Sequence, residues 1–189
     1  IRDRMMTTPT LAPLTTADLA PLAPELVLIG GAFALLMLDL FMSQRHKVWT
    51  HLFSVAVLAV VFALLATGTG GQGEAFHGMF VRDTAADVMK TVIVLVSGLS
   101  LVYGWTYLRE RNLYQGEIPV LVLFATAGMM LLASAGSLLM VYLGLELLAL
   151  CSYALVASNR DNGLATEAAM KYFVLGSLAS GLLLYGCLL

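Results

Sequence analysis

The chain has 189 residues, of which 60% are hydrophobic and only 12% charged, and its mean hydropathy is +0.89. Soluble domains carry about 25% charged residues, so a water-soluble protein of this composition would expose large apolar patches and aggregate. The composition excludes a soluble enzyme and indicates a chain surrounded by a lipid bilayer. The net charge of −2, without a basic run, argues against a nucleic-acid partner.

The amino-terminal residues 1–21 form a polar tail rich in Thr and Pro, and the rest of the chain reads as membrane helices. A spanning helix needs about 20 mostly apolar residues. Runs such as VAVLAVVFALLA are continuously apolar, whereas barrel strands would alternate. The sequence therefore predicts an all-α, polytopic membrane helix bundle over residues 22–189. Its six predicted spans are 22–42, 48–67, 85–108, 118–135, 137–157 and 165–189.

The connections between these spans predict the orientation in the membrane. One side carries five basic residues in its connections: Arg45, Lys47, Arg109, Arg111 and Arg160. The other side carries Arg82, with Arg2 and Arg4 in the tail. The positive-inside rule then predicts that the first side is cytoplasmic and the amino terminus lies outside. Residues 68–84, rich in Gly, are expected to form an exposed loop between the second and third spans.

The two ends of the chain suggest that it is part of a longer protein. LLLYGCLL runs to Leu189 without a polar residue at a membrane interface. At the other end Met5 and Met6 are plausible starts, so Ile1–Arg4 need not be native. The basic residues are separated from the first apolar run by a polar segment, and that run is full length, so we expect the first helix to remain rather than act as a signal peptide.

Glu146 is the most informative charged residue. It lies nine residues into the fifth predicted span, close to mid-membrane, where an ionisable group is costly and usually marks function. Helical spacing places Tyr142, Ala149 and Tyr153 on the same face. Loss of hydration favours the protonated form of such a carboxyl, which suits a proton carrier. The alternative is a protonated glutamate that only packs against another helix.

Lys171 in the sixth span is the second candidate for proton transfer. Glu167 precedes it by four residues, the favourable order for a helical ion pair. The alternative is snorkelling, in which the ammonium reaches the interface. We expect Glu146 and Lys171 to share one proton path, with backbones about 11 Å apart, depths that differ by about 7 Å, and side chains that one water could bridge.

Four further charged residues lie near the ends of predicted spans. Lys90 and Asp87 are near the outer end of the third span, and Asp39 and Glu25 lie at the two ends of the first. Interfacial anchoring is at least as plausible as a functional role for each of them.

The sequence carries none of the motifs expected of a redox protein. Cys151 and Cys187 lie in apolar runs and lack the spacing of a disulfide scaffold or a metal site. A phosphate-binding glycine loop, a thiol redox pair and paired haem-ligand histidines are also missing from the sequence. The small residues of Gly176–Gly181 predict only close helix packing. We therefore expect no metal and no bound cofactor in this chain.

Residues 140–186 resemble a known family. The elements YLGLEL, YALVA, NRD and TEAAMKYFVLG follow one another there as in subunit N of the proton-pumping NADH–quinone oxidoreductases, the respiratory complex I enzymes. LLMLDLF, residues 35–41, is a weaker match. The resemblance extends over the chain in helix order, and residues 140–186 carry most of it.

The resemblance implies an antiporter-like subunit of about fourteen helices, of which this chain would hold six. Glu146 in GLEL matches the family's channel glutamate and Lys171 in AAMKYF its helix-six lysine, whereas the helix-seven lysine would lie beyond Leu189. The implied function is proton translocation coupled to electron transfer from NADH to quinone. Flavin and iron–sulfur centres would belong to other subunits of the complex, which are the expected partners. The positions in the predicted spans, rather than the resemblance, suggest four supporting residues: Asp39, Lys90, Tyr142 and Glu167.

Two other functions stay open at this point. A subunit of a multisubunit cation/proton antiporter, or of a related membrane hydrogenase, would share the helix-five glutamate. A membrane scaffold would transport nothing, and replacing Glu146 in it would have no effect.

Overall fold

The computed structural model describes residues 16–41, 47–111, 115–159 and 161–188. The predicted tail lies outside these residues as far as residue 15, as do Arg45 and Arg160. The all-α prediction is confirmed over the described ranges, with one short hairpin added. The helical elements are η1 (Thr16–Leu22), α1 (Ala23–Phe41), α2 (Lys47–Ala66), α3 (Thr84–Glu110), α4 (Glu117–Ala133), α5 (Leu138–Val156) and α6 (Gly163–Leu188).

The helices begin where the sequence supplies capping groups or proline. The Asp83 carboxylate accepts a hydrogen bond from the Ala86 amide at 2.7 Å, and the Ser137 hydroxyl accepts one from Met140 at 3.2 Å. Pro24 and Pro119 lie in the first turns of α1 and α4, where a missing amide breaks no helical hydrogen bond.

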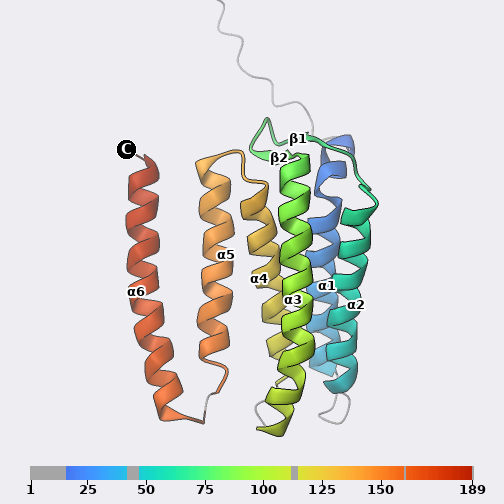
Figure 1. Ribbon diagram of the computed structural model, residues 1–189. Helices are drawn as coiled ribbons and strands as arrows, with labels where there is room; N and C mark the ends of the chain where they lie inside the picture. The colour runs from blue at the N-terminus through green and yellow to red at the C-terminus, as the bar shows by residue number, and fades with distance from the viewer. Residues whose placement is uncertain (1–15, 42–46, 112–114, 160, 189) are drawn as a thin grey trace, which may run out of the picture.

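The helices stand side by side as a membrane bundle (Figure 1). Within the described residues five of them are long and apolar enough to cross a membrane. The remaining long helix is α4, which has 17 residues where the sequence predicted 18. Seventeen residues of α-helix span about 26 Å. The helix is short for a bilayer of about 30 Å, but its position among the other helices compensates, because nine of its residues are buried against protein.

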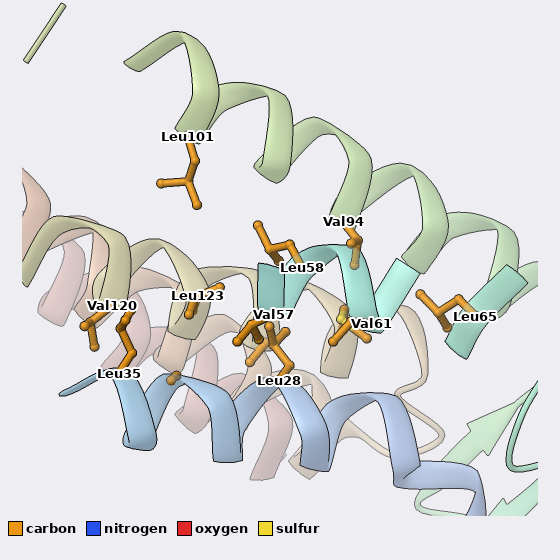
Figure 2. Close-up of a cluster of buried hydrophobic side chains, with 13 residues drawn as sticks. Leu28, Leu35, Val57, Leu58, Val61, Leu65, Val94, Leu101, Val120 and Leu123 are labelled. Atoms are coloured by element: carbon orange, nitrogen blue, oxygen red, sulfur yellow. The ribbon is translucent and has the colours of Figure 1, made fainter. Parts of the chain in front are cut away.

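Helices α1 to α4 share one apolar core, with α4 at its centre. Figure 2 shows Leu28 of α1 beside Val57 of α2, and Leu35 of α1 beside Val120 of α4. α5 packs against α4, and α6 packs against α5 at the edge of the row (Figure 1). Large apolar side chains on the outer faces of α1, α2, α3 and α6 remain exposed, as helices facing lipid require.

The Gly-rich segment between α2 and α3 is exposed in part, as its composition suggested, but it is a folded hairpin rather than a plain loop. It forms a hairpin of β1 (Gly73–Ala75) and β2 (Phe80–Arg82), with Ala75 paired to Phe80. Ala75 and Phe80 are buried at 1% and 0% exposure. The glycines supply tight turns instead: Gly70 has φ +98°, and a side chain there would collide with the Ala20 carbonyl. We call this end of the bundle the hairpin end.

Two glycines let α4 and α5 approach closely. A Cβ atom at Gly128 would lie 2.9 Å from both the Gly144 carbonyl oxygen and the Leu148 amide nitrogen. A Cβ atom at Gly144 would lie 2.9 Å from Leu132 and 3.0 Å from the Gly128 carbonyl oxygen. This contact fixes which face of α5 is turned toward α4, and so also which face carries the candidate functional residues.

Candidate functional site

Glu146 lies in the middle of α5, on the face turned away from α4. It is two residues from both Gly144 and Leu148, or about 200° around the helix from the face that contacts α4. Its side chain is half-buried, and among the described residues no basic group forms an ion pair with it. Glu146 lies near the middle of α5, about 12 Å from Leu138 and about 15 Å from Val156.

The predicted tyrosine stripe lies on the same face of α5 and meets α6. Tyr153 makes edge-to-face ring contacts with Tyr172 at 4.9 Å and with Phe173 at 5.7 Å. Its hydroxyl occupies the space that a side chain at Gly176 would need, so the expected close packing at Gly176 is confirmed. Glu146 lies seven residues, or about 20° around the helix, from Tyr153, and so on the same face of α5. The α5 face with Glu146 is therefore the face that α6 covers.

The structure does not bring Lys171 to this face. Ala169, the one described residue of α6 that is fully buried, lies two residues or about 200° from Lys171 around the helix. The Lys171 side chain is 71% exposed, and its Nζ lies 2.5 Å from Glu167 Oε1. The predicted Glu167–Lys171 pair is confirmed, and Lys171 points away from α5.

Glu146 and Lys171 also differ in depth more than expected. The ring contacts place Tyr153 level with residues 172–176 of α6. Glu146 lies seven residues, about 10 Å, from Tyr153 toward the hairpin end, whereas Lys171 lies beyond that turn in the opposite direction. The expectation that one water bridges these two side chains is wrong, because they differ in both face and depth.

A fully buried ion pair joins α1 to α3 near the hairpin end. Lys90 Nζ lies 2.6 Å from Glu25 Oε1, and the two side chains are 0% and 1% exposed. The Lys90 ammonium also lies 4.9 Å from the centre of the Phe80 ring. Interfacial anchoring, the alternative given to these residues from the sequence, is wrong because neither side chain reaches solvent. Removing one partner of such a pair costs about 3–5 kcal/mol, since it leaves the other charge buried alone.

Arg82 forms a second charged contact at the hairpin end. Its Nε donates to Asp87 Oδ1 at 2.8 Å, and its Nη1 donates to the Thr69 carbonyl at 2.8 Å and the Pro21 carbonyl at 3.5 Å. The arginine is buried and Asp87 is partly exposed. Asp87 is thus engaged by protein, and Arg82, treated from the sequence only as a loop charge, connects β2 with η1, the α2–β1 connection and α3.

Asp39 lies at the opposite end of the bundle. With Glu117 and Ser158 it lines a pocket of about 340 Å³ between α1, α4 and α5. Its carboxylate occupies the space beside Gly116, at the amino terminus of α4, where a helix dipole favours negative charge. Asp39 therefore lies at the end of the bundle opposite the hairpin, whereas Glu146 lies near the middle of α5.

The described residues contain no cluster of three or more side chains that could hold a metal ion. Cys151 is buried and Cys187 half-buried, and neither forms a disulfide within the described ranges. The residues described above include carboxyl, phenol and amine groups. Groups of these kinds can hold and transfer protons.

The sequence carries one signal for the buried pair. Glu25 and Lys90 have opposite charges and lie at the same predicted end of two different spans, so a pair between them was possible. A charged group inside a membrane usually has a partner. The sequence carries no comparable signal for the direction in which Lys171 points. That direction depends on the rotation of α6, which the contact between Tyr153 and Gly176 sets.

Comparisons with known proteins place these residues in a family context. Residues 135–189 match the family described as "NADH:quinone oxidoreductase/Mrp antiporter, TM". Residues 14–104 match "NAD(P)H-quinone oxidoreductase subunit 2 N-terminal". Glu146, the tyrosine stripe and Lys171 fall in the first match, and the buried pair falls in the second.

Individual relatives are subunits N of NADH-quinone oxidoreductases. The chain is 96% identical over 182 residues to NADH-quinone oxidoreductase subunit N of Xanthomonas euvesicatoria pv. vesicatoria, covering 96% of this chain and 37% of the relative. It is 44% identical over 172 residues to subunit N of Methylovorus glucosotrophus, covering 90% of this chain and 36% of that protein. The chain thus spans little more than a third of the length of these relatives.

A solved structure has the same fold. A chain of respiratory complex I from Thermus thermophilus with bound aureothin is similar over 86% of this chain and 35% of its own length. The TM-score is 0.68 and the sequence identity is 30%.

Proposed function

Because the chain belongs to the subunit N family of NADH-quinone oxidoreductases, we propose that its full-length protein is a proton-translocating membrane subunit of such an enzyme. The observation that carries the proposal is Glu146. It is a half-buried carboxyl in the middle of α5, on the face that α6 covers, without a basic partner among the described residues. A carboxyl in such a place can exchange a proton as the surrounding charges change.

In this proposal Glu146 holds the proton and the tyrosines line its route. Tyr153 and Tyr142 lie along the same face of α5, two turns and one turn from Glu146. Their hydroxyls can donate to and accept from water or a carboxylate. Lys171 and Glu167 form a second protonatable pair on the far side of α6. A basic group from the remainder of the full-length protein would then be the direct partner of Glu146, and Lys171 would act one step further along.

The coupling in this proposal is electrostatic. A charge that moves near Glu146 changes its affinity for a proton, and by linkage the protonation of Glu146 changes the energetics of that charge. Flavin, iron–sulfur centres, NADH and quinone would be bound by other subunits of the complex in the bacterial inner membrane. Electron transfer in those subunits would supply the moving charge.

A cation/proton antiporter subunit is the second candidate, because the family description matched at residues 135–189 includes antiporters. The experiment is to delete the gene of the full-length protein, restore it, and measure NADH-driven acidification in membrane vesicles. The proposal expects NADH-driven proton uptake and quinone reduction to be lost together and restored together. Unchanged NADH-driven uptake with a lost sodium/proton exchange would instead identify an antiporter.

The orientation of the bundle leads to a prediction that can be tested on intact cells. If the hairpin end faces outward, as the loop charges predict, a cysteine replacing Gly71 should react with an impermeant thiol reagent added outside. A cysteine replacing Asn159, at the opposite end, should react only after the membrane is opened. The reverse pattern would show that the hairpin end faces the cytoplasm.

A further inference from the structure

The hairpin and the α4–α5 turn together cover the hairpin end of the bundle, and we call these two segments the cap. The Val81 amide donates to the Ser134 carbonyl at 2.9 Å, and the Gly136 amide donates to the Met79 carbonyl at 2.8 Å. Phe80 of β2 also pairs with Ala135 as an isolated bridge. The inward side of the cap is apolar, with Phe80 and Ala75 packed beside Leu22.

Arg82 fastens the cap to its surroundings. Its guanidinium is hydrogen-bonded to Asp87 of α3 and to the carbonyls of Thr69 and Pro21. The start of α3, the α2–β1 connection and η1 therefore meet on one buried side chain. This explains how a short two-stranded hairpin, which is marginal by itself, holds a fixed position over the helices.

The Glu25–Lys90 pair lies directly beneath the cap. Lys90 contacts the Phe80 ring on one side and the Glu25 carboxylate on the other, and Glu25 Oε2 has no hydrogen-bond partner among the described residues. Burial of these charges is tolerated only while they compensate each other. A lone charge at either position would draw water inward, and the nearest barrier to water from the hairpin end is the cap itself.

Packing alone does not account for charges at these two positions. A buried ion pair is seldom more stable than apolar side chains of the same volume, so an apolar pair would fill the same space. An ion pair differs from an apolar pair in one respect: the closed arrangement of the bundle around it is stable only while both charges are present. If either charge is neutralised or displaced, the other favours an open, hydrated arrangement.

We propose that Glu25 and Lys90 form an electrostatic latch that keeps the cap closed and water out of the bundle interior at the hairpin end. The buried interior beneath the latch is the apolar core that α1, α2, α3 and α4 share, with Val94 and Leu28 among its residues. On the proposed function, which this inference extends, the latch would keep water, and the protons that water carries, from entering the membrane subunit through this core.

The test measures water access beneath the latch, in the full-length protein within its assembled complex. Val94 is buried one turn, about 6 Å, below Lys90 on the same face of α3. The parent protein carries Val94→Cys with Cys151 and Cys187 replaced by alanine. A water-soluble thiol reagent is added, and the labelling rate is normalised to the amount of assembled complex. Glu74→Cys, exposed on the hairpin, calibrates the reagent.

We expect slow labelling of Val94→Cys in the parent. Glu25→Gln, which keeps the size but leaves Lys90 unpaired, should raise the rate about tenfold or more, because it favours the opened state. Exchanging the charges with Glu25→Lys and Lys90→Glu should return the rate toward that of the parent. Lys171→Met, which removes a lysine from the exposed pair with Glu167, should leave the rate unchanged.

Two results would overturn the latch. The first is an assembled Glu25→Gln variant in which Val94→Cys is labelled as slowly as in the parent. The second is fast labelling that the exchange of Glu25 and Lys90 does not slow. If Glu25→Gln prevents assembly, Glu25→Asp replaces it, because the shorter side chain keeps its charge and separates the pair. The same two outcomes then decide. The assay requires no proton pumping, so its result is independent of whether the proposed function holds.

Discussion

Glu146→Gln in the full-length protein is expected to abolish most proton transfer through this subunit while leaving the complex assembled. Glutamine keeps the size and polarity of the side chain but cannot release a proton at this position. Positioned proton-transfer groups contribute about 100-fold or more to the rates they assist, so the subunit's share of proton uptake should fall by a similar factor. The measurement is NADH-driven proton uptake in vesicles, divided by the content of assembled complex.

Two further variants show whether an effect at Glu146 is chemical. Glu146→Asp keeps an acid and should retain part of the uptake. Lys171→Arg keeps the positive charge but cannot release a proton, so it should also impair uptake if Lys171 carries protons. Normal uptake with Glu146→Gln would make the glutamate a packing residue, the structural alternative that its sequence position allowed. Normal uptake with Lys171→Arg would leave the Glu167–Lys171 pair with a purely structural role.

Gly128→Ala is expected to destabilise the protein by about 1–3 kcal/mol, the usual cost of overpacking an interior. The new methyl group would lie 2.9 Å from backbone atoms of Gly144 and Leu148, which cannot rotate away as a flexible side chain could. α4 and α5 would have to separate, and the face of α5 that carries Glu146 would move with them. The measurement is the temperature at which the assembled complex loses this subunit.

Gly104→Ala provides the matched control for this prediction. Gly104 lies inside α3, and a Cβ atom there would meet nothing within 4 Å. The change is chemically identical, and helix propensity alone favours alanine by about 1 kcal/mol. We therefore expect Gly104→Ala to be neutral or slightly stabilising. If both variants lowered the temperature equally, the close contact between α4 and α5 would not be the cause.

The helices were predictable from the sequence because a long apolar run has one stable conformation in lipid. Every backbone group must find its partner within the run, so α2 and α5 begin and end within a residue of the expected bounds. The hairpin was not predictable in the same way. Its strands have three residues each, too few for a recognisable alternation, and its glycines indicated only the turns.

The candidate site was predictable as far as it depends on a single helix. The spacing of Tyr142, Glu146 and Tyr153 gives one face of α5 whatever surrounds it. The relation of Glu146 to Lys171 depends instead on the register and rotation between α5 and α6, which the Tyr153–Gly176 contact sets. The Glu25–Lys90 pair likewise depends on how α1 and α3 are each placed against α2 and α4, and no local pattern encodes that placement.

The Glu167–Lys171 pair bears on how α6 enters the membrane during synthesis. A single acidic or basic side chain at the centre of an inserting helix costs about 2.5–3.5 kcal/mol on insertion scales. Here the two charges lie one turn apart on the same helix, with 2.5 Å between Lys171 Nζ and Glu167 Oε1. Each therefore brings its own counter-ion through the translocation machinery. α6 can remain in lipid beside α5 as a helical hairpin, before any other helix reaches its exposed face.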